Sequence, residues 1–288
     1  MSNILELRKV SKQYKNFAFG LKDISFSLPS GSIMGYVGEN GAGKTTTIGC
    51  ILNTLFKDSG SIELFGKKME DEDTAIREDI GVVFDGDNFP NYLSADKLAS
   101  VMQGIYSNWD DALFREQLST FKLNGEQKIK TYSKGMRMKL AIAAALAHHP
   151  KLLILDEATS GLDPIMRDEI LDVFLDFVQD EEHSILLSSH ITSDLEKVAD
   201  YITFIHEGEI ILTASKDDLR YKYAVMRCKA AQFDSLDRSD IIAFRRKDYQ
   251  IDVLVADKDA AMRKHKDVVL DSVSIDEIML LLVKGEKA

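Results

Sequence analysis

A glycine-rich octet is the segment of this chain whose residue types and spacing specify a chemistry most narrowly. It carries two glycines separated by four residues, then a lysine and a threonine, and reads Gly38-Glu39-Asn40-Gly41-Ala42-Gly43-Lys44-Thr45. Glycines let the backbone wrap closely around a polyphosphate, so that its N–H groups surround the phosphate oxygens. The lysine and the start of the following helix favour phosphate charge, and the threonine hydroxyl can bind Mg²⁺. The octet therefore predicts a nucleotide-binding loop, with candidate binding residues Gly38, Asn40, Gly41, Gly43, Lys44, Thr45 and Thr46.

The residues that flank the octet supply the setting that such a loop requires. Residues 32–37 form a short apolar run typical of a buried strand, and residues 46–52 begin a helical pattern. A strand, a loop and a helix in this order place the phosphates at the positive end of the helix. A chance match of the octet is the alternative, and the flanking pattern makes it less favoured.

A second candidate segment lies at residues 151–157, where a continuous apolar run ends in Asp156 and Glu157. Such a run is typical of a buried parallel strand, and nucleotide sites lie at the carboxyl ends of these strands. Asp156 would hold Mg²⁺ through water, and Glu157 would orient or deprotonate the water that attacks the γ-phosphate. A solvated strand end followed by an acidic turn is the alternative, which the upstream phosphate loop disfavours.

The continuation of this segment, Leu155-Asp156-Glu157-Ala158-Thr159-Ser160-Gly161-Leu162-Asp163-Pro164, resembles the Walker B and D-loop region of ATP-binding cassette (ABC) ATPases. With the further segments below, the chain is identified as a member of that family over residues 1 to about 213. The resemblance implies an α/β fold: a P-loop NTPase (RecA-like) parallel-sheet core with an antiparallel β subdomain, an inserted helical subdomain and a small C-terminal α+β extension. It also implies ATP hydrolysis, with ATP and Mg²⁺ as cofactors.

The resemblance assigns further residues to nucleotide binding. Tyr14 resembles the aromatic on which the family stacks adenine, and a lone surface tyrosine is the alternative. The run Tyr132-Ser133-Lys134-Gly135-Met136 resembles the family signature, whose commonest form is Leu-Ser-Gly-Gly-Gln. Ser133 and Gly135 are kept and would offer a hydroxyl and a backbone N–H to phosphate. The variant looks like that of a branch of exporter ATPases. By itself, Ser133 is an N-cap of a helix over residues 135–147.

Two polar residues follow other apolar runs. Residues 184–189 predict a buried strand, and His190 after it falls where the family has its switch histidine, which would contact the γ-phosphate and help align Glu157 with the water. A polar strand cap is the alternative. Asp85 occupies the position at which the family usually has a Mg²⁺-sensing glutamine. An aspartate can bind the metal's water shell, but it is shorter, adds negative charge and cannot donate a hydrogen bond when ionised. The sequence leaves the role of Asp85 open.

The apolar patterns predict the layout around these residues. Alternation predicts a small antiparallel sheet with strands at residues 4–10, 21–28 and 61–65. A closing hairpin is expected at 201–205 and 209–213. Beyond residue 218, short strands are expected at 223–231, 241–245 and 250–256, and a capping box at Ser274 and Glu277 predicts a last helix over 275–283. We therefore expect a nucleotide-binding domain over 1–218, with a helical subdomain inserted at about 88–150, and a small accessory region over 219–288.

The composition of the chain limits where in the cell the protein is expected and which partners it is expected to bind. The chain has 288 residues, 45% of them hydrophobic, and its longest apolar run, residues 141–147, is far shorter than the roughly 20 residues that cross a bilayer. The first residues contain neither a basic leader nor a long apolar stretch, so no signal peptide is expected. Cys50 and Cys228 fit core positions in a reducing cytoplasm. A net charge of −11 argues against nucleic-acid binding and against direct adhesion to an anionic membrane.

One phosphate loop and one signature predict an assembly. The family places the signature against the nucleotide of an opposite subunit, so the chain is expected to pair with itself or a paralogue as a head-to-tail dimer. The dimer would drive a separately encoded transmembrane permease, docked near residues 85–93, at the inner face of the cell membrane. The expected function is export of a drug, antimicrobial peptide or other amphipathic molecule. The alternative is a soluble ABC ATPase acting on nucleic acid or the ribosome, but such relatives carry two cassettes or long coiled coils, which are absent here. A small-molecule kinase would not need Ser133 or His190.

Overall fold

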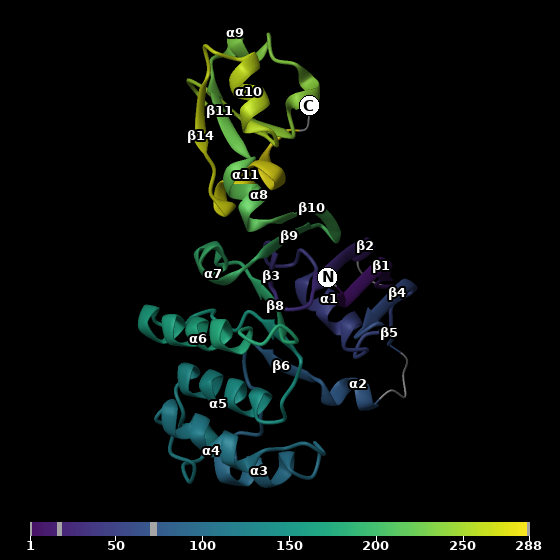
Figure 1. Cartoon of the computed structure of the whole chain (residues 1–288), viewed down its shortest axis with the longest axis vertical. Coiled ribbons are helices and arrows are strands. Elements are labelled where there is room, and N and C mark those ends of the chain that lie inside the picture. Colours follow the sequence, from purple (N-terminus) through teal and green to yellow (C-terminus); the bar gives the residue numbers. More distant parts are fainter. Residues whose placement is uncertain (1, 16–18, 70–73, 287–288) are drawn as a thin grey trace.

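The computed structural model of the chain describes residues 2–15, 19–69 and 74–286 (Figure 1). A six-stranded sheet forms its centre, in the order β10-β9-β3-β8-β7-β6. Its strands are β3 (Ile33–Val37), β6 (Ile80–Phe84), β7 (Leu152–Asp156), β8 (Ser184–Ser189), β9 (Tyr201–His206) and β10 (Glu209–Ser215). Neighbouring strands from β6 to β9 run parallel, and β10 pairs antiparallel with β9. The parallel core and the closing hairpin are therefore confirmed.

The central sheet separates two apolar clusters, because successive side chains of a strand point to opposite faces. On β7, Ile154 packs in a cluster with α1 (Lys44–Ile51) and the N-terminal strands. Leu153 and Leu155 pack instead with α5 (Lys134–Leu146) and α6 (Pro164–Phe177). The strand is therefore buried on both faces, which explains why its sequence is continuously apolar rather than alternating.

The N-terminal sheet is antiparallel and has the order β2-β1-β4-β5. Its strands are β1 (Asn3–Gln13), β2 (Gly20–Pro29), β4 (Ser59–Leu64) and β5 (Lys67–Lys68). The predicted strands are confirmed, and β1 and β2 run a few residues longer than the alternation indicated. Their inward residues pack with α1, so this sheet covers one face of the core. The short helix α2 (Thr74–Glu78) leads from it into β6.

Residues 88–150 are helical, as predicted. They contain α3 (Ala95–Met102), α4 (Asp111–Thr120), a 3₁₀ turn (Ile129–Thr131) and α5. The side chain of Asp110 accepts a hydrogen bond from the Leu113 N–H at 2.9 Å and caps α4. Ser133 caps α5 in the same way, so this helix begins and ends one residue earlier than predicted. In the described part of the chain no helix is long and apolar enough to cross a membrane.

The C-terminal residues form a third sheet, of order β12-β13-β11-β14. The elements after β10 are α8 (Lys216–Tyr221), β11 (Ala224–Cys228), α9 (Ala230–Phe233), a 3₁₀ turn (Arg238–Asp240), β12 (Ala243–Arg246), β13 (Ile251–Val255), α10 (Lys258–Lys264), β14 (Val269–Ser272) and α11 (Ile275–Lys284). The three predicted strands are confirmed, but the first stops at Cys228 because α9 begins two residues later. Helix α10 and strand β14 are not predicted from the sequence.

The C-terminal sheet is tied to the core by α7 (Thr192–Val198) and α11. Leu195 on α7 lies in one apolar cluster with Ile275 and Ile278 on α11, and Glu196 accepts from the Ile275 N–H at 3.0 Å. Half of the capping box is confirmed, since Ser274 accepts from the Glu277 N–H at 3.2 Å. The Glu277 carboxylate instead accepts from Arg227. The domain boundary at residue 218 stays a prediction, and it falls within α8.

The buried His148 makes a testable contribution to stability. Its ring stacks on Tyr106, with 3.9 Å between centroids, and its Nε2 lies 3.2 Å from the carbonyl oxygen of Ile80. Burial lowers the pKa of His148 below its usual value. Below about pH 6.5 the unfolded chain therefore binds a proton at this histidine that the folded chain does not bind. The free energy of unfolding then decreases as the pH is lowered, by up to about 1.4 kcal/mol per pH unit.

We expect the free energy of unfolding in urea to fall less between pH 7.5 and 5.5 for His148→Gln than for the unchanged protein, because glutamine does not titrate. His149→Gln is the matched control, since the adjacent His149 is exposed and pairs with Asp110. It should keep the full decrease of the unchanged protein. An equally steep decrease in His148→Gln would show that another group causes the effect.

Candidate nucleotide-binding and catalytic site

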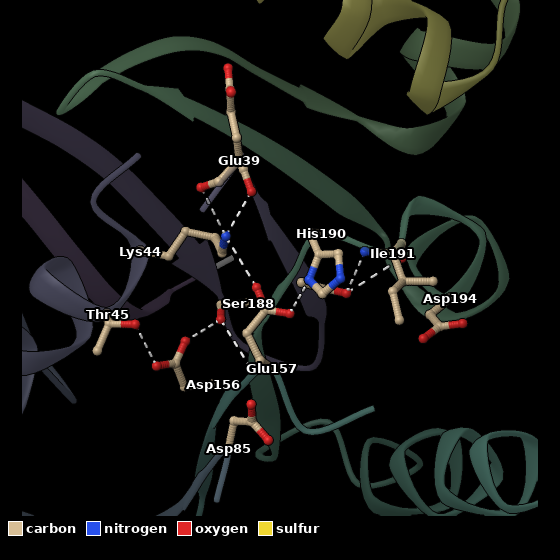
Figure 2. Close-up of polar contacts among 12 residues, drawn as sticks. Glu39, Lys44, Thr45, Asp85, Asp156, Glu157, Ser188, His190, Ile191 and Asp194 are labelled. Carbon is tan, nitrogen blue, oxygen red and sulfur yellow. Dashed lines mark hydrogen bonds and ion pairs between the residues drawn. The ribbon is translucent and has the colours of Figure 1, made fainter. Parts of the chain in front are cut away.

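The predicted site residues gather where three elements meet. The loop before α1, the carboxyl end of β7 and the carboxyl end of β8 lie together at one edge of the central sheet (Figure 2). These strands are neighbours in the order β3-β8-β7, although 114 residues lie between β3 and β7 along the chain. The edge therefore combines a helix N-terminus with two strand ends, as nucleotide sites in parallel sheets do.

The phosphate loop has the backbone that its glycines predict. Gly43 caps α1 with φ 119°, and Gly41 has φ 84°, both in the left-handed region that favours glycine. Lys44 is 6% exposed, and its ammonium donates to the carbonyl oxygens of Gly38 at 2.6 Å and Glu39 at 3.3 Å. The ammonium of Lys44 is thus hydrogen-bonded to the loop backbone, and a bound phosphate could accept these hydrogen bonds in place of the carbonyl oxygens.

Asp156 joins the three elements through its carboxylate. The Thr45 hydroxyl donates to its Oδ2 at 2.7 Å, and the Ser188 hydroxyl donates to its Oδ1. Asp156 is 5% exposed, so these hydrogen bonds compensate for the loss of water around the charge. A carboxylate oxygen beside a hydroxyl is a donor set that suits Mg²⁺, which usually completes its shell with waters and phosphate oxygens. The described residues contain no group of three or more His, Cys, Asp or Glu that could hold a metal ion by itself.

Glu157 follows in a left-handed conformation, with φ 54°. Its N–H points back at Ser188, 3.1 Å from the carbonyl oxygen and 3.2 Å from the hydroxyl. Left-handed backbone is unfavourable for a side chain with a Cβ, so these contacts hold a strained turn. The turn aims the carboxylate between Lys44 and His190: its Oε1 lies 3.1 Å from Lys44 Nζ, and its Oε2 lies 2.6 Å from His190 Nδ1. Such a carboxylate can orient a water toward a phosphate held by Lys44.

His190 lies at this site as predicted, and it is more exposed than Glu157, the acid that it contacts. Its side chain is 43% exposed, against 15% for Glu157. It follows β8, and the neighbouring turn is fixed by the Ser189 hydroxyl oxygen, which accepts from the Ile191 N–H at 2.9 Å. The imidazole can thus reach a ligand from the solvent side while its other nitrogen orients Glu157.

An aromatic pair lies beside the phosphate loop. Tyr14 stacks on Phe19 with 6.4 Å between ring centroids. Phe19 lines a pocket of about 450 Å³ together with Asn40, Gly41 and His206. Phe19 is therefore the aromatic that lines this pocket, and Tyr14 packs against Phe19; the adenine-stacking role of Tyr14 stays a prediction. Thr46 lies one residue further on, in the first turn of α1.

Sequence reasoning missed two buried polar residues, Ser188 in the site and Asp194 on the helix that follows His190. Ser188 lies within an apolar strand and shows its role only when β7 and β8 are paired. Asp194 on α7 is 3% exposed, and its Oδ2 lies 3.8 Å from Arg167 Nε. Burial raises the pKa of Asp194, and the nearby Thr159 and the positive charge of Arg167 oppose that shift. The acid thus lies under the turn that follows Glu157. For Ser188 the only signal was a polar residue at the end of an apolar run, and Asp194 lies in a polar stretch that gives no such signal.

Three candidates do not join this cluster. Ser133 is exposed at the start of α5, where its hydroxyl oxygen accepts from the Met136 N–H at 3.2 Å. Gly135 packs so closely on Met166 that an added Cβ would lie 1.8 Å from the sulfur. Asp85 lies below the network in Figure 2, and its Oδ1 is 2.8 Å from Lys134 Nζ. A metal role for Asp85 therefore stays a prediction.

Removing the Ser188 hydroxyl tests whether it positions both acids. We expect Ser188→Ala to raise the Mg²⁺ requirement or lower the turnover of ATP by about 10- to 100-fold, as is usual when a partner of a metal-binding group is lost. Phosphate release at varied Mg²⁺ concentration measures this. Ser184→Ala is the matched control, because Ser184 is equally buried at the other end of β8 and hydrogen-bonds the Gly31 N–H at 3.0 Å. Equal losses in both variants would contradict a local role.

Comparison with known proteins agrees with this geometry. The ABC transporter family model matches residues 21–160. The bacitracin transport ATP-binding protein BcrA of Bacillus licheniformis is 30% identical over 265 residues, 91% of this chain and 85% of that protein. The lantibiotic transport ATP-binding protein SrtF of Streptococcus pyogenes is 33% identical over 218 residues, 74% of this chain and 92% of that protein.

Solved structures share the architecture. A structure of the ATP-binding subunit of an ABC transporter has a TM-score of 0.66 and 26% identity, and the match covers 75% of this chain and 92% of that chain. Identity at this level along most of the length of a relative, together with a shared fold, shows that the likeness is not confined to a short motif. The chain therefore belongs to the family of ABC transporter ATP-binding proteins and is an ATP-hydrolysing enzyme.

Proposed function

We propose that this ATPase closes head to tail on a second copy, with one ATP between each phosphate loop and the opposite signature. The observation that carries the proposal is the position of Ser133. Its exposed hydroxyl begins α5, and among the described residues no hydrogen bond joins it to Lys44, Asp156 or Glu157. A single copy therefore offers the signature outward, whereas a two-fold axis would bring two signatures to two sites at once.

The nucleotide would hold this dimer together by contacting both copies. The γ-phosphate would take the place that Glu157 now holds beside Lys44, while Thr45 and Asp156 would hold Mg²⁺. Magnesium would neutralise the developing charge on the phosphate oxygens. Glu157 and His190 would orient the attacking water, and Ser133 and Gly135 of the other copy would donate to the same phosphate. Hydrolysis would remove contacts shared by both copies and let them separate.

We further propose that the dimer drives a separate transmembrane permease that exports an antimicrobial peptide or a similar amphipathic molecule. Support comes from BcrA and SrtF, whose names assign them to bacitracin and lantibiotic transport. Exposed aromatics near the proposed docking segment, Phe84 at 38% and Tyr92 at 73%, could contact such a partner. The ATPase would then lie at the inner face of the membrane through its permease.

The oligomeric mass of Glu157→Gln with and without Mg-ATP tests the dimer. Glutamine keeps the shape of the side chain but cannot act as a base, so hydrolysis should fall at least about 100-fold and the closed dimer should accumulate. Sedimentation or mass photometry should show a dimer with Mg-ATP and a monomer with Mg-ADP. Adding Ser133→Arg should abolish the dimer without abolishing ATP binding. A protein that binds ATP but stays monomeric would contradict the proposal that two copies close on ATP without another partner.

Export can be tested in a cell that carries the chain and its permease. Loss of the chain should lower the inhibitory concentration of bacitracin or of a lantibiotic, because less of the compound is removed. A Lys44→Ala copy should fail to restore resistance, since it lacks the phosphate-binding ammonium. Lys151→Ala, on the exposed start of the segment that leads into β7, is the matched control and should restore it. Resistance that does not depend on the chain would rule these compounds out.

A further inference from the structure

The segment that follows β6 is tied to the start of α5 by two ion pairs. Asp85 Oδ1 lies 2.8 Å from Lys134 Nζ, and Asp87 Oδ1 lies 3.3 Å from Arg137 Nε. The two acids flank Gly86, which has φ 104° in the bend after β6, and the two cations are three residues apart on one helix face. Segments separated by about 50 residues along the chain are thus held side by side.

These pairs bracket Ser133. Lys134 follows it directly, and Arg137 also donates from Nη1 to the carbonyl oxygen of Tyr132 at 2.7 Å, on the other side of the serine. The residues before and after Ser133 are therefore both fixed by side chains that reach toward the end of β6. Where the serine hydroxyl and the Gly135 N–H point depends on these contacts.

The segment that carries Asp85 is itself fixed in position by neighbouring contacts. Phe84 is paired in register with Asp156, so Asp85 emerges beside the strand end that carries the catalytic acids. The Asn88 side chain closes the turn, accepting from the Phe84 N–H at 2.9 Å and donating to the Phe84 carbonyl at 2.8 Å. The position of Asp85 therefore follows the position of Asp156 closely.

The charge of Lys134 explains how an aspartate can occupy position 85, close to other acids. An unpaired Asp85 would add negative charge near Asp156, Glu157 and a polyphosphate, and the ammonium of Lys134 offsets it. The same ammonium lies against the turn after Glu157, since a Cβ added to Gly161 would be 3.1 Å from Nζ. Lys134 thus touches the segments on both sides of the catalytic acids, and the Asp85 carboxylate is already engaged by a cation.

We propose that Asp85 is a positioning residue, whose ion pair with Lys134 holds Ser133 in the orientation that closes on the nucleotide of the second copy. The pair connects the acids at one site with the signature that completes the other site. This inference rests on the proposed dimer. It assigns Asp85 to the alignment of the signature rather than to the Mg²⁺ shell, and it makes Lys134 the partner that this role requires.

A double-mutant cycle in Glu157→Gln protein tests the pair. Asp85→Asn and Lys134→Met each remove it with little change in volume. An exposed ion pair shifts an equilibrium by about two- to fivefold, and the dimer holds two copies, so each variant should weaken Mg-ATP-dependent dimerisation by about 4- to 25-fold. The double variant should be no weaker than either single one, because both remove the same contact. The effect should shrink near 1 M KCl, where the Debye length is about 3 Å.

Arg115→Met is the matched control, since Arg115 pairs with Asp111 at 2.7 Å on the exposed face of α4. It should leave dimerisation unchanged. The proposed role of the ion pair would be overturned if the double variant lost the product of the two single losses in dimer affinity. It would also be overturned if the variants dimerised as tightly as their Glu157→Gln parent. Neither result would contradict the dimer itself. A Glu157→Gln parent that stays monomeric would overturn the dimer itself.

The Mg²⁺ requirement of hydrolysis supplies a second measurement, in protein that keeps Glu157. Asp85→Asn and Lys134→Met should show the same half-saturating Mg²⁺ concentration as the unchanged protein. A higher requirement in Asp85→Asn alone would place Asp85 in the metal shell and overturn the proposal.

Discussion

The hydrogen bonds on the Asp156 carboxylate join the parts of the molecule that make up its site. One oxygen receives the hydroxyl of Thr45 from the start of α1, and the other receives the hydroxyl of Ser188 from β8. A buried carboxylate is costly unless it is hydrogen-bonded, so folding must bring both hydroxyls to it. The phosphate loop, the end of β7 and the strand that leads to His190 are thereby held at fixed mutual positions.

Glu157 depends on the same serine. Its left-handed backbone is held by contacts of its N–H with Ser188, and only this turn lets its carboxylate face both Lys44 and His190. Without a nucleotide, the carboxylate offsets the charge of the lysine. An arriving γ-phosphate would compete for that lysine and free Glu157 to hold a water. The resting ion pair and the proposed catalytic role thus use the same side-chain position.

The start of α5, which carries Ser133, is positioned by a different set of contacts. Lys134 and Arg137 hold the two sides of Ser133 through acids that follow β6. Because Phe84 on β6 pairs with Asp156 on β7, a movement of the end of β7 would also move the acids that follow β6. The helical region therefore has a direct mechanical connection to the parallel core, in addition to the packing of His148 against β6.

The sequence by itself determined the phosphate loop, the acid pair at the end of a buried strand and the order of the main elements. These follow from local rules: glycine where φ is positive, apolar runs where both faces are buried, and a serine or aspartate at a helix start. It also placed the C-terminal strands, although it missed α10 and β14, whose weak patterns carry little local signal.

Only the tertiary structure decided which polar groups meet. Ser188 reads as one more residue of an apolar strand until β8 is set beside β7, and Asp194 becomes a buried acid only through the packing of α7. Asp85 occupies the position of a metal-sensing glutamine, but its ion pair with Lys134, 49 residues away in sequence, is seen only in the fold. Side-chain pairing depends on distances between elements, and a one-dimensional pattern does not contain those distances.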